Sequence, residues 1–249
     1  MRTPGEPCWI QLSTDDVDAA ISFYGDLFGW SVGEASEEYQ GYRMFFRGDQ
    51  PIAGLVPMFA GSTPTWTVFL DTPDLARTVE RATAAGGRVL VEPMPVADLG
   101  SFAELVDPAG AAVGAWQADT FSGFATRAQM NAPGWFETLS TDYDAAVAFY
   151  RDAFGWETHV MSDSPEFRYT TLGQNEGARA GIMDAAGFLG DLPARWQFYL
   201  QVADTDEAVA TGVAIGGEVV QVAEDTPYGR TAALIDPSGV RFSVMAPSF

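Results

Sequence analysis

The chain has 249 residues, of which 34 are acidic and 13 are basic, and its net charge at pH 7 is −21. This acidity disfavours nucleic acid and anionic membranes as partners, because both bind basic surfaces, and it favours a neutral or cationic small molecule. Every basic residue is an arginine, which excludes lysine chemistry such as a Schiff base, a pyridoxal phosphate anchor or a phosphate-binding loop.

The first predicted elements belong to a stretch that the chain contains twice. Residues 9–30 read WIQLSTDDVDAAISFYGDLFGW, and residues 135–156 read WFETLSTDYDAAVAFYRDAFGW. The two copies are identical at 11 of 22 positions and are separated by a constant offset of 126. Each copy predicts a strand and then a helix, which begins at Asp16 or Asp142 and ends at a glycine such as Gly29. A repeat of about half the chain length indicates two duplicated domains.

Three further strand-like runs follow the first helix. They cover residues 30–32, 42–46 and 52–58, and turn-rich pieces such as residues 47–51 separate them. Together with the strand at 9–14 and the helix, they make one strand–helix–strand–strand–strand unit.

A second unit of the same kind completes each half of the chain. The run WTVFL at 66–70 corresponds to WQFYL at 196–200, and each is followed by a helix that ends at paired glycines. Each half then closes with a DPxG turn, which begins at Asp107 or Asp236 and precedes a final strand. Proline fixes φ in such a turn, and glycine accepts positive φ. The sequence therefore predicts an α+β fold with four βαβββ units.

The segment between the two halves has little hydrophobic periodicity. It contains Gly123 and Pro133, which are typical of a linker. We therefore predict an N-terminal domain over residues 1–118, a linker over 119–134 and a C-terminal domain over 135–249. Each domain is long enough to bury its own core.

Three motifs occur in the same order in both halves: a D-x-D-A-A-x-x-F-Y-x-x-x-F-G-W helix, a GGxV middle and a DPxG ending. This order resembles the vicinal oxygen chelate superfamily, which includes glyoxalase I, bleomycin-resistance proteins and extradiol dioxygenases. The chain is similar in particular to tandem-domain actinomycete proteins found in antibiotic gene clusters. The resemblance implies that each pair of βαβββ units forms an incomplete mixed β-barrel around a cavity. In active relatives this cavity holds a divalent metal.

The residues at the metal-binding positions of these relatives are poor ligands here. The resemblance places the first-strand ligand at Trp9 and Trp135, which cannot coordinate a metal. It places the others at Gly54 and Gly181, Thr67 and Gln197, and Gly114 and Ser243. A single His159 and a single Cys8 exclude a Cys/His zinc site and a 2-His-1-carboxylate iron site within one chain. We therefore expect no metal and no other cofactor, although Glu137, Gln197 and Ser243 could hold a hard cation weakly.

Tryptophans and glycines at these positions favour a ligand cavity. Small residues at Gly54, Gly114 and Gly181 would open volume, and tryptophan rings would supply flat apolar faces. Small-molecule sites are mostly apolar with a few placed polar groups. The candidate ligand-binding residues are Trp9, Gln11, Gly54, Thr67, Phe69, Gly114, Trp116, Trp135, Gln197, Tyr199, Ser243 and Met245. The alternative is that both tryptophans fill a collapsed core.

Glu137 is the candidate catalytic acid or base. It lies two residues after Trp135, and a carboxylate in an apolar hollow suits proton transfer or the binding of a ligand amine. Its counterpart in the first half is Gln11, which cannot titrate. The alternative is an ordinary strand carboxylate that is exposed or bonded to backbone. We interpret His159, which occurs in one half only, as a surface or edge residue.

These features favour a metal-independent glyoxalase- or bleomycin-resistance-like protein. It would bind an apolar, aromatic, neutral or cationic natural product in a resistance, carrier or antibiotic-biosynthesis accessory role. One alternative is a metal-free enzyme of hydroxylase-associated, isomerase or lyase type, with Glu137 acting on a polyketide or a small dicarbonyl. A second is a metal-dependent glyoxalase or dioxygenase. A candidate protein partner is an oxygenase of the same pathway. The lone cysteine and the lack of an apolar run near about 18 residues predict a cytoplasmic protein.

Overall fold

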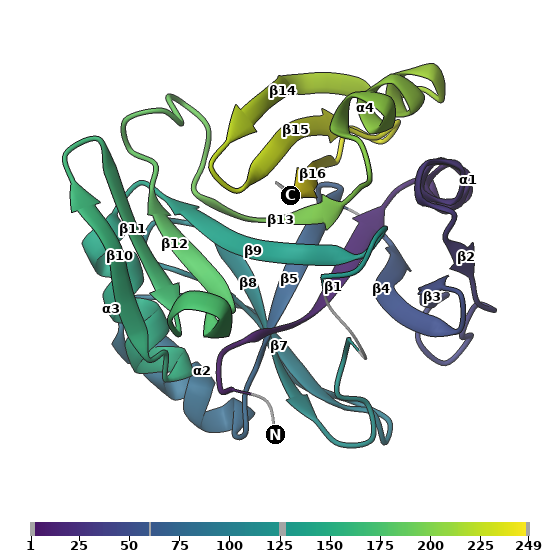
Figure 1. The fold of residues 1–249 in the computed structure, drawn as a ribbon. Helices are drawn as coiled ribbons and strands as arrows, with labels where there is room; N and C mark the ends of the chain where they lie inside the picture. Colours follow the sequence, from purple (N-terminus) through teal and green to yellow (C-terminus); the bar gives the residue numbers. More distant parts are fainter. Residues whose placement is uncertain (1–2, 60, 125–127, 248–249) are drawn as a thin grey trace. The chain divides into compact units, whose positions relative to one another are not determined.

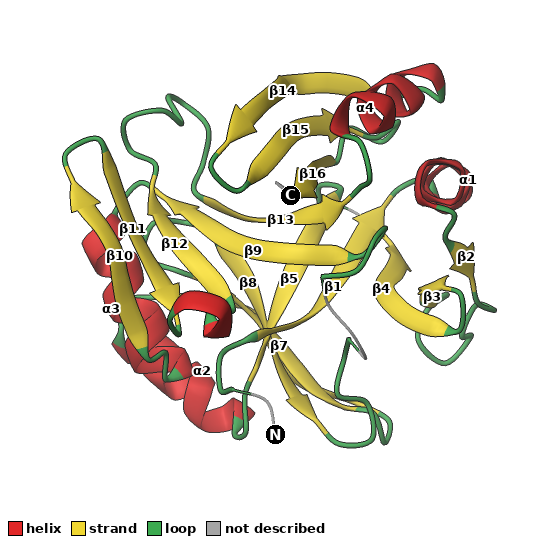
Figure 2. Cartoon of the chain, in the orientation of Figure 1, coloured by secondary structure: helices red, strands yellow, loops and turns green. Residues whose placement is uncertain are grey.

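The computed structural model describes residues 3–59, 61–124 and 128–247. Its elements are β1 (Pro7–Thr14), α1 (Val17–Phe28), β2 (Ser31–Val32), β3 (Arg43–Arg47), β4 (Gln50–Pro57), β5 (Thr65–Asp71), α2 (Leu75–Ala84), β6 (Arg88–Val96), β7 (Gly100–Val106), β8 (Ala112–Ala118), β9 (Pro133–Ser140), α3 (Tyr143–Phe154), β10 (Thr158–Ser164), β11 (Phe167–Leu172), the short 3-10 helix η1 (Asn175–Gly177), β12 (Ala180–Asp184), β13 (Arg195–Gln201), α4 (Thr205–Ala214), β14 (Glu218–Thr226), β15 (Gly229–Ile235) and β16 (Arg241–Pro247). Strands dominate the regular structure (Figure 2). Among the described residues they form two mixed eight-stranded sheets that do not close into barrels, which confirms the α+β class. No helix in these ranges is long and apolar enough to cross a membrane.

The chain divides into two compact units, and each unit draws on both halves of the sequence. The first unit contains Met1–Cys8, Val68–Gly123 and Phe136–Gln197, and the second contains Trp9–Thr67, Phe124–Trp135 and Phe198–Phe249. In the first unit α2 packs against α3, and in the second unit α1 packs against α4 (Figure 1). The predicted boundaries at 118 and 135 describe the duplication of the sequence. That separate folding domains end and begin at these residues stays a prediction.

The strand order confirms the predicted βαβββ units. The four groups run β2-β3-β4-β1, β5-β8-β7-β6, β10-β11-β12-β9 and β13-β16-β15-β14. In each group the first and last strands along the chain pair in parallel, as β1 does with β4 and β9 with β12. Parallel strands need a long crossover, and the helix of each unit belongs to that crossover. The sequence pattern gives no range for the hairpin strands β7 and β15, which precede the DPxG turns.

The two repeated helices begin and end where the sequence predicts. The Asp16 and Asp142 carboxylates accept hydrogen bonds from the backbone N–H three residues later, at 2.9 and 3.2 Å. Such an N-cap contributes about 1 kcal/mol to stability. Gly29 and Gly155 end the helices with φ of 69° and 73°, a left-handed conformation that glycine adopts without strain.

A buried tyrosine joins the two sequence halves within the second unit. The Tyr24 hydroxyl accepts a hydrogen bond from Trp66 Nε1 and donates one to Asp236 Oδ2, both at 3.0 Å. Asp236 is the aspartate of the second DPxG turn, and its Oδ1 accepts the N–H groups of Ser238 and Val240 at 2.9 Å. Burial raises the pKa of both Tyr24 and Asp236 above their ordinary values. A helix of the first half thus bonds directly to the last turn of the second half.

Tyr150 makes the corresponding network in the first unit. Its hydroxyl accepts from Trp196 Nε1 at 2.7 Å and donates to Asp107 Oδ2 at 3.0 Å. The other carboxylate oxygen of Asp107 accepts the backbone N–H of Ala111 at 2.9 Å. Burial raises the pKa of Asp107, although these hydrogen bonds act in the opposite direction. The DPxG aspartate therefore does more than form a turn, because it also binds a helix from the opposite half.

The tryptophans that end the repeated FGW motif make a matching pair of contacts. Trp30 Nε1 donates to the Asn131 carbonyl at 2.8 Å, and Trp156 Nε1 donates to the Gly5 carbonyl at 2.9 Å. Asn131 and Gly5 hold equivalent places before β9 and β1, and both have positive φ, 60° and 77°. In each unit the tryptophan of one half therefore binds the entry segment of the other half.

The described part of the predicted linker, residues 119–134, packs as part of the fold. Phe124 is buried. The Asn131 N–H donates to the Gln201 carbonyl of β13 at 2.7 Å. Residues 125–127 of the linker lie outside the described residues. The part of the linker directly before β9 is thus hydrogen-bonded to β13.

Replacing Tyr24 with phenylalanine is expected to lower the free energy of unfolding by about 1–3 kcal/mol, because a buried indole N–H loses its acceptor and a buried carboxylate loses a donor. Tyr150→Phe should act similarly in the first unit. Urea unfolding followed by tryptophan fluorescence measures both changes. Tyr228→Phe, at an exposed tyrosine, is the control and should change stability by less than about 0.5 kcal/mol. Wild-type stability in both core variants would contradict this account.

Candidate functional site

Glu137 is a buried carboxylate bonded to two side-chain donors. It lies on β9 and is 4% exposed. Its Oε2 accepts a hydrogen bond from the Tyr169 hydroxyl at 2.7 Å, and its Oε1 accepts one from Gln197 Nε2 at 2.8 Å. The structure thus brings together Glu137 and Gln197, both predicted from sequence, and adds Tyr169. Buried carboxylates usually have such partners, and this cluster is a buried polar centre of the first unit in addition to the Asp107 network.

Aromatic rings cover the glycines that were expected to open space. Tyr169 lies over Gly181, Tyr42 over Gly54 and Phe69 over Gly114, so close that a side-chain carbon at any of these glycines would overlap the ring. The expectation of open volume at these three glycines is therefore wrong. They make room for neighbouring aromatic side chains. A sequence signal exists for the two tyrosines, since each precedes its glycine by 12 residues (54 − 42 and 181 − 169).

Trp9 belongs to the core of the second unit. It is 5% exposed, its Nε1 donates to the Tyr42 hydroxyl at 3.1 Å, and its ring centroid lies 5.4 Å from that of Phe124. Burial raises the pKa of Tyr42 to about 12. Gln11, the counterpart of Glu137, lies in register with Gly54 and is half-buried. Trp9 is thus packed in the core of the second unit, and its predicted contact with a ligand stays a prediction.

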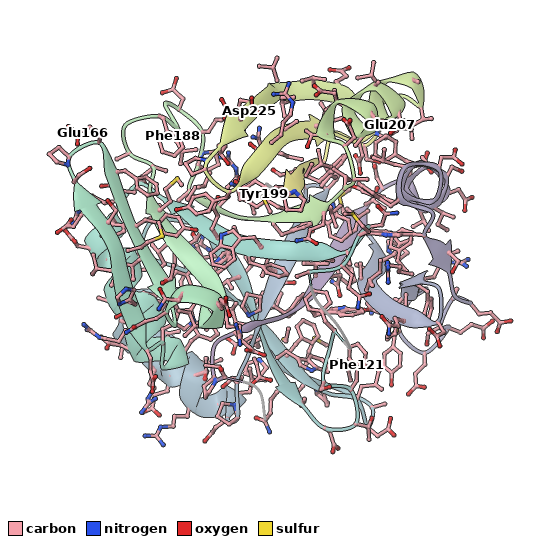
Figure 3. All side chains as sticks on the ribbon, in the orientation of Figure 1. Phe121, Glu166, Phe188, Tyr199, Glu207 and Asp225 are labelled. Carbon is pink, nitrogen blue, oxygen red and sulfur yellow. The ribbon has the colours of Figure 1, made fainter. Side chains whose placement is uncertain are left out.

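An aromatic face lies on β5, β7 and β8 of the first unit, and we define it by Phe69, Phe102 and Trp116. Phe69 is in register with Gly114, and Phe102 with Trp116, so their side chains share one side of the strands. The Phe69 and Phe102 rings lie 6.1 Å apart in an edge-to-face arrangement. Trp116 Nε1 donates to the Phe121 carbonyl at 2.8 Å (Figure 3 labels Phe121). The predicted residues Phe69, Gly114 and Trp116 therefore lie on one side of the strands, where Phe69 and Trp116 are 4% and 9% exposed.

Glu104 lies on this aromatic face and was missed from sequence. It lies on β7 in register with Gly114 of β8. Because it is two residues after Phe102, its side chain points to the same side of the strand. Its side chain is half-buried, and burial alone raises its pKa above the ordinary value. Within the described ranges it has no ion pair and no side-chain hydrogen bond. A lone glutamate on an ordinary strand gives no sequence signal, so only the pairing of β7 with β8 reveals it.

The remaining predicted residues lie at separate places. Tyr199 and Ser243 are in register on β13 and β16 of the second unit (Figure 3 labels Tyr199), and Ser243 is 3% exposed. Thr67 is buried on β5, whereas Trp135 and Met245 are half-buried. His159 is half-buried on β10, at one end of the strand order. Whether these residues bind a ligand stays a prediction.

Metal-ligand chemistry is sparse in the described part of the chain. Within it, no three His, Cys, Asp or Glu side chains gather closely enough to hold a metal ion. The Glu137 cluster offers one carboxylate, a phenol and an amide. The carboxylate accepts hydrogen bonds from the phenol and the amide, and a single carboxylate supplies only part of the oxygen ligands that a hard cation takes.

Each half of the sequence matches a glyoxalase-type family. Residues 8–114 match the glyoxalase/bleomycin resistance protein/dioxygenase superfamily, and residues 136–245 match the glyoxalase-like domain. CFP32 of Mycobacterium bovis is 32% identical over 98% of this chain and 95% of its own length. The chain belongs to the glyoxalase/bleomycin resistance protein/dioxygenase superfamily. It carries the superfamily's domains in tandem, as the repeat predicts.

The chain is also similar to an anthracycline biosynthesis protein in sequence, and to a glyoxalase and a dioxygenase in fold. The anthracycline biosynthesis protein DauV of a Streptomyces species is 30% identical, over 97% of this chain and 93% of its own. The Mn(II)-bound glyoxalase of Novosphingobium aromaticivorans superimposes with a TM-score of 0.65 at 14% identity, covering 99% of this chain and 83% of the glyoxalase. The 2,3-dioxygenase LapB of Pseudomonas sp. KL28 gives 0.65 at 13% identity, covering 100% and 94%. At such identities these structures support the fold alone.

The divalent metal that the superfamily fold implies does not fit the residues present here. At the expected ligand positions stand Trp9 and Trp135, which have no lone pair to offer, and three glycines covered by aromatic rings. Thr67, Gln197 and Ser243 are neutral, and such oxygens bind hard cations weakly without carboxylates.

Gly181→Ala is expected to lower the free energy of unfolding by about 1–3 kcal/mol, because the added methyl group displaces the Tyr169 ring from Glu137. Gly187→Ala is the matched control, since a methyl group there meets open space and should be neutral or slightly stabilising. Urea unfolding of both variants provides the comparison. Equal stability of the two would show that Tyr169 does not occupy the place over Gly181.

Proposed function

We propose that this protein binds an aromatic, amine-bearing natural product without a metal ion and serves as an accessory in antibiotic biosynthesis. The observation that carries the proposal is an unpaired, half-buried Glu104 on a face lined by Phe69, Phe102 and Trp116. Aromatic rings attract cations through their π faces, and a nearby carboxylate adds direct charge attraction. Together these groups favour a protonated amine attached to an aromatic system.

The burial of Glu104 gives this preference a physical reason. Removing a carboxylate from water without a partner is unfavourable, which is why its pKa is raised. A bound ammonium group would supply the missing partner, so part of the cost of burial would be regained in the complex. A neutral ligand of the same shape would lack this gain.

The relatives support the same ligand class. DauV of Streptomyces and DnrV of Streptomyces peucetius are both named anthracycline biosynthesis proteins. An aromatic natural product is therefore the ligand that we propose for this chain, with an oxygenase of the same pathway as its protein partner. We propose the cytoplasm as its compartment, because a single cysteine suits a reducing environment.

Binding of aromatic amines should depend on Glu104. In a titration followed by tryptophan fluorescence, naphthylmethylamine is expected to bind about tenfold or more tightly than neutral naphthylmethanol, since charge-assisted contacts contribute about 1.5–3 kcal/mol. Glu104→Gln should abolish this difference. Glu92→Gln, at an exposed glutamate on β6, is the matched control and should retain it. Equal affinities for amine and alcohol in the wild type would end the proposal.

The buried Glu137 favours a second candidate function, a metal-free enzyme acting on a polyketide or a small dicarbonyl. Its carboxylate holds the Tyr169 hydroxyl at 2.7 Å and the Gln197 amide at 2.8 Å. The carboxylate could accept a proton from a bound carbonyl compound, and the phenol could donate one to it.

Turnover of a dicarbonyl such as methylglyoxal tests this second function. If Glu137 is the base, Glu137→Gln should lower kcat by about 100-fold or more while ligand binding remains. Glu166→Gln, on the turn between β10 and β11 (labelled in Figure 3), is a suitable control for loss of one carboxylate. Unchanged kcat in Glu137→Gln, or no turnover by the wild-type protein, would remove this candidate.

A further inference from the structure

Arg241 is an arginine without a carboxylate partner. It opens β16 in the second unit, and its Nη2 donates to the Gln221 Oε1 at 3.3 Å. The Gln221 amide donates in turn to Glu224 at 2.7 Å, so an amide stands between the arginine and that carboxylate. Glu218, in the same cross-strand row, makes no ion pair with it. Across the described residues Arg241 therefore has no ion pair.

The guanidinium also contains a buried donor with no acceptor. Arg241 is half-buried as a whole, whereas its Nε is buried and has no hydrogen-bond partner among the described residues. Burial lowers the pKa of Arg241 from its ordinary value, yet an arginine stays protonated in proteins. Buried polar groups are nearly always paired in folded proteins. An unpaired donor on a charged group therefore points to an acceptor that is supplied from outside the chain.

Arg241 shares one side of the sheet with Ser243 and Tyr199. The intervening Phe242 lies on the other side, where its ring centroid is 5.8 Å from that of Phe23 and 5.6 Å from that of Tyr24. Tyr199 is in register with Ser243 and acts electrostatically on Arg241. Strand alternation and register thus place a cation, a hydroxyl and a phenol on one side of β13 and β16.

The other half of the sequence carries none of these groups at the equivalent positions. Counted from the DPxG aspartates, Arg241 corresponds to Ala112 and Ser243 to Gly114. Counted from the repeated tryptophan of WTVFL and WQFYL, Tyr199 corresponds to Phe69. One copy of the scaffold is therefore apolar at these places, whereas the other holds donors and a fixed positive charge. The core network does not explain the difference, because both copies conserve their Trp–Tyr–Asp contacts.

We propose that Arg241, Ser243 and Tyr199 form a binding site for the carboxylate of an aromatic acid. The guanidinium supplies the charge and the unpaired Nε donor, which matches the planar geometry of a carboxylate. Ser243 and Tyr199 supply a hydroxyl and a phenol beside it. This site uses none of the residues of the amine-binding face, so either site can fail its test without the other.

Benzoate is the probe for this site, and benzamide is its neutral counterpart of the same shape. Calorimetric titration of the full chain at low salt should give saturable benzoate binding that is at least tenfold tighter than benzamide binding. Arg241→Gln should remove this preference. Arg151→Gln, which deletes the same charge at an exposed arginine paired with Asp152, should retain it. Equal affinity for the two probes, or an unchanged preference in Arg241→Gln, would overturn the proposal.

A second measurement decides the question if Arg241→Gln fails to fold. In the wild-type protein, the arginine Nε–H resonances can be followed by NMR during the same titration. One Nε–H signal should shift on addition of benzoate and stay in place on addition of benzamide, because a buried donor gains an acceptor only from the acid. No such shift would contradict the proposal.

Discussion

A buried phenol that lies between an indole N–H and a carboxylate holds each compact unit together. Because every hydrogen-bonding group of this trio is buried, the loss of any partner would leave an unsatisfied polar group and lower the free energy of unfolding. The trio therefore fixes a helix, a strand and a turn at once, and its members come from both halves of the sequence. Trp66 and Trp196 sit directly before Thr67 and Gln197. Side chains alternate along a strand, so Thr67 and Gln197 point to the side of the sheet opposite the tryptophans. Phe69 and Tyr199, two residues later, point to the same side, where the candidate sites lie.

Local features of the fold could be predicted from sequence because their causes are local. The aspartate caps, the glycine stops and the DPxG turns each depend on a few adjacent residues. The pairing of one half with the other could not be predicted, because Tyr24 and Asp236 are 212 positions apart and neither motif specifies its partner. The candidate site divides in the same way. Glu137 and Gln197 could be predicted because polar residues are unusual at their positions. Glu104 and Arg241 could not, because only their neighbours in the folded structure mark them as candidates.

The glycines show how a sequence pattern can mislead. Loss of ligand side chains suggested empty space, but the tyrosines twelve residues earlier fill it at Gly54 and Gly181. A core resists voids, so a missing side chain is usually matched by a larger neighbour. The two copies differ on the side of the sheet away from the helices. One has aromatic rings around a carboxylate, and the other has an arginine beside a serine and a tyrosine.

Hydrogen exchange measured by mass spectrometry tests most directly whether a network shared by both halves builds each unit. Loss of the phenol of Tyr24, in the first half, should speed exchange at residues 238–245 of the second half, whose N–H groups at Ser238 and Val240 bond to Asp236. Loss of the phenol of Tyr150 should speed exchange at residues 109–113 of the first half. Faster exchange confined to the half that carries the substitution would contradict the account.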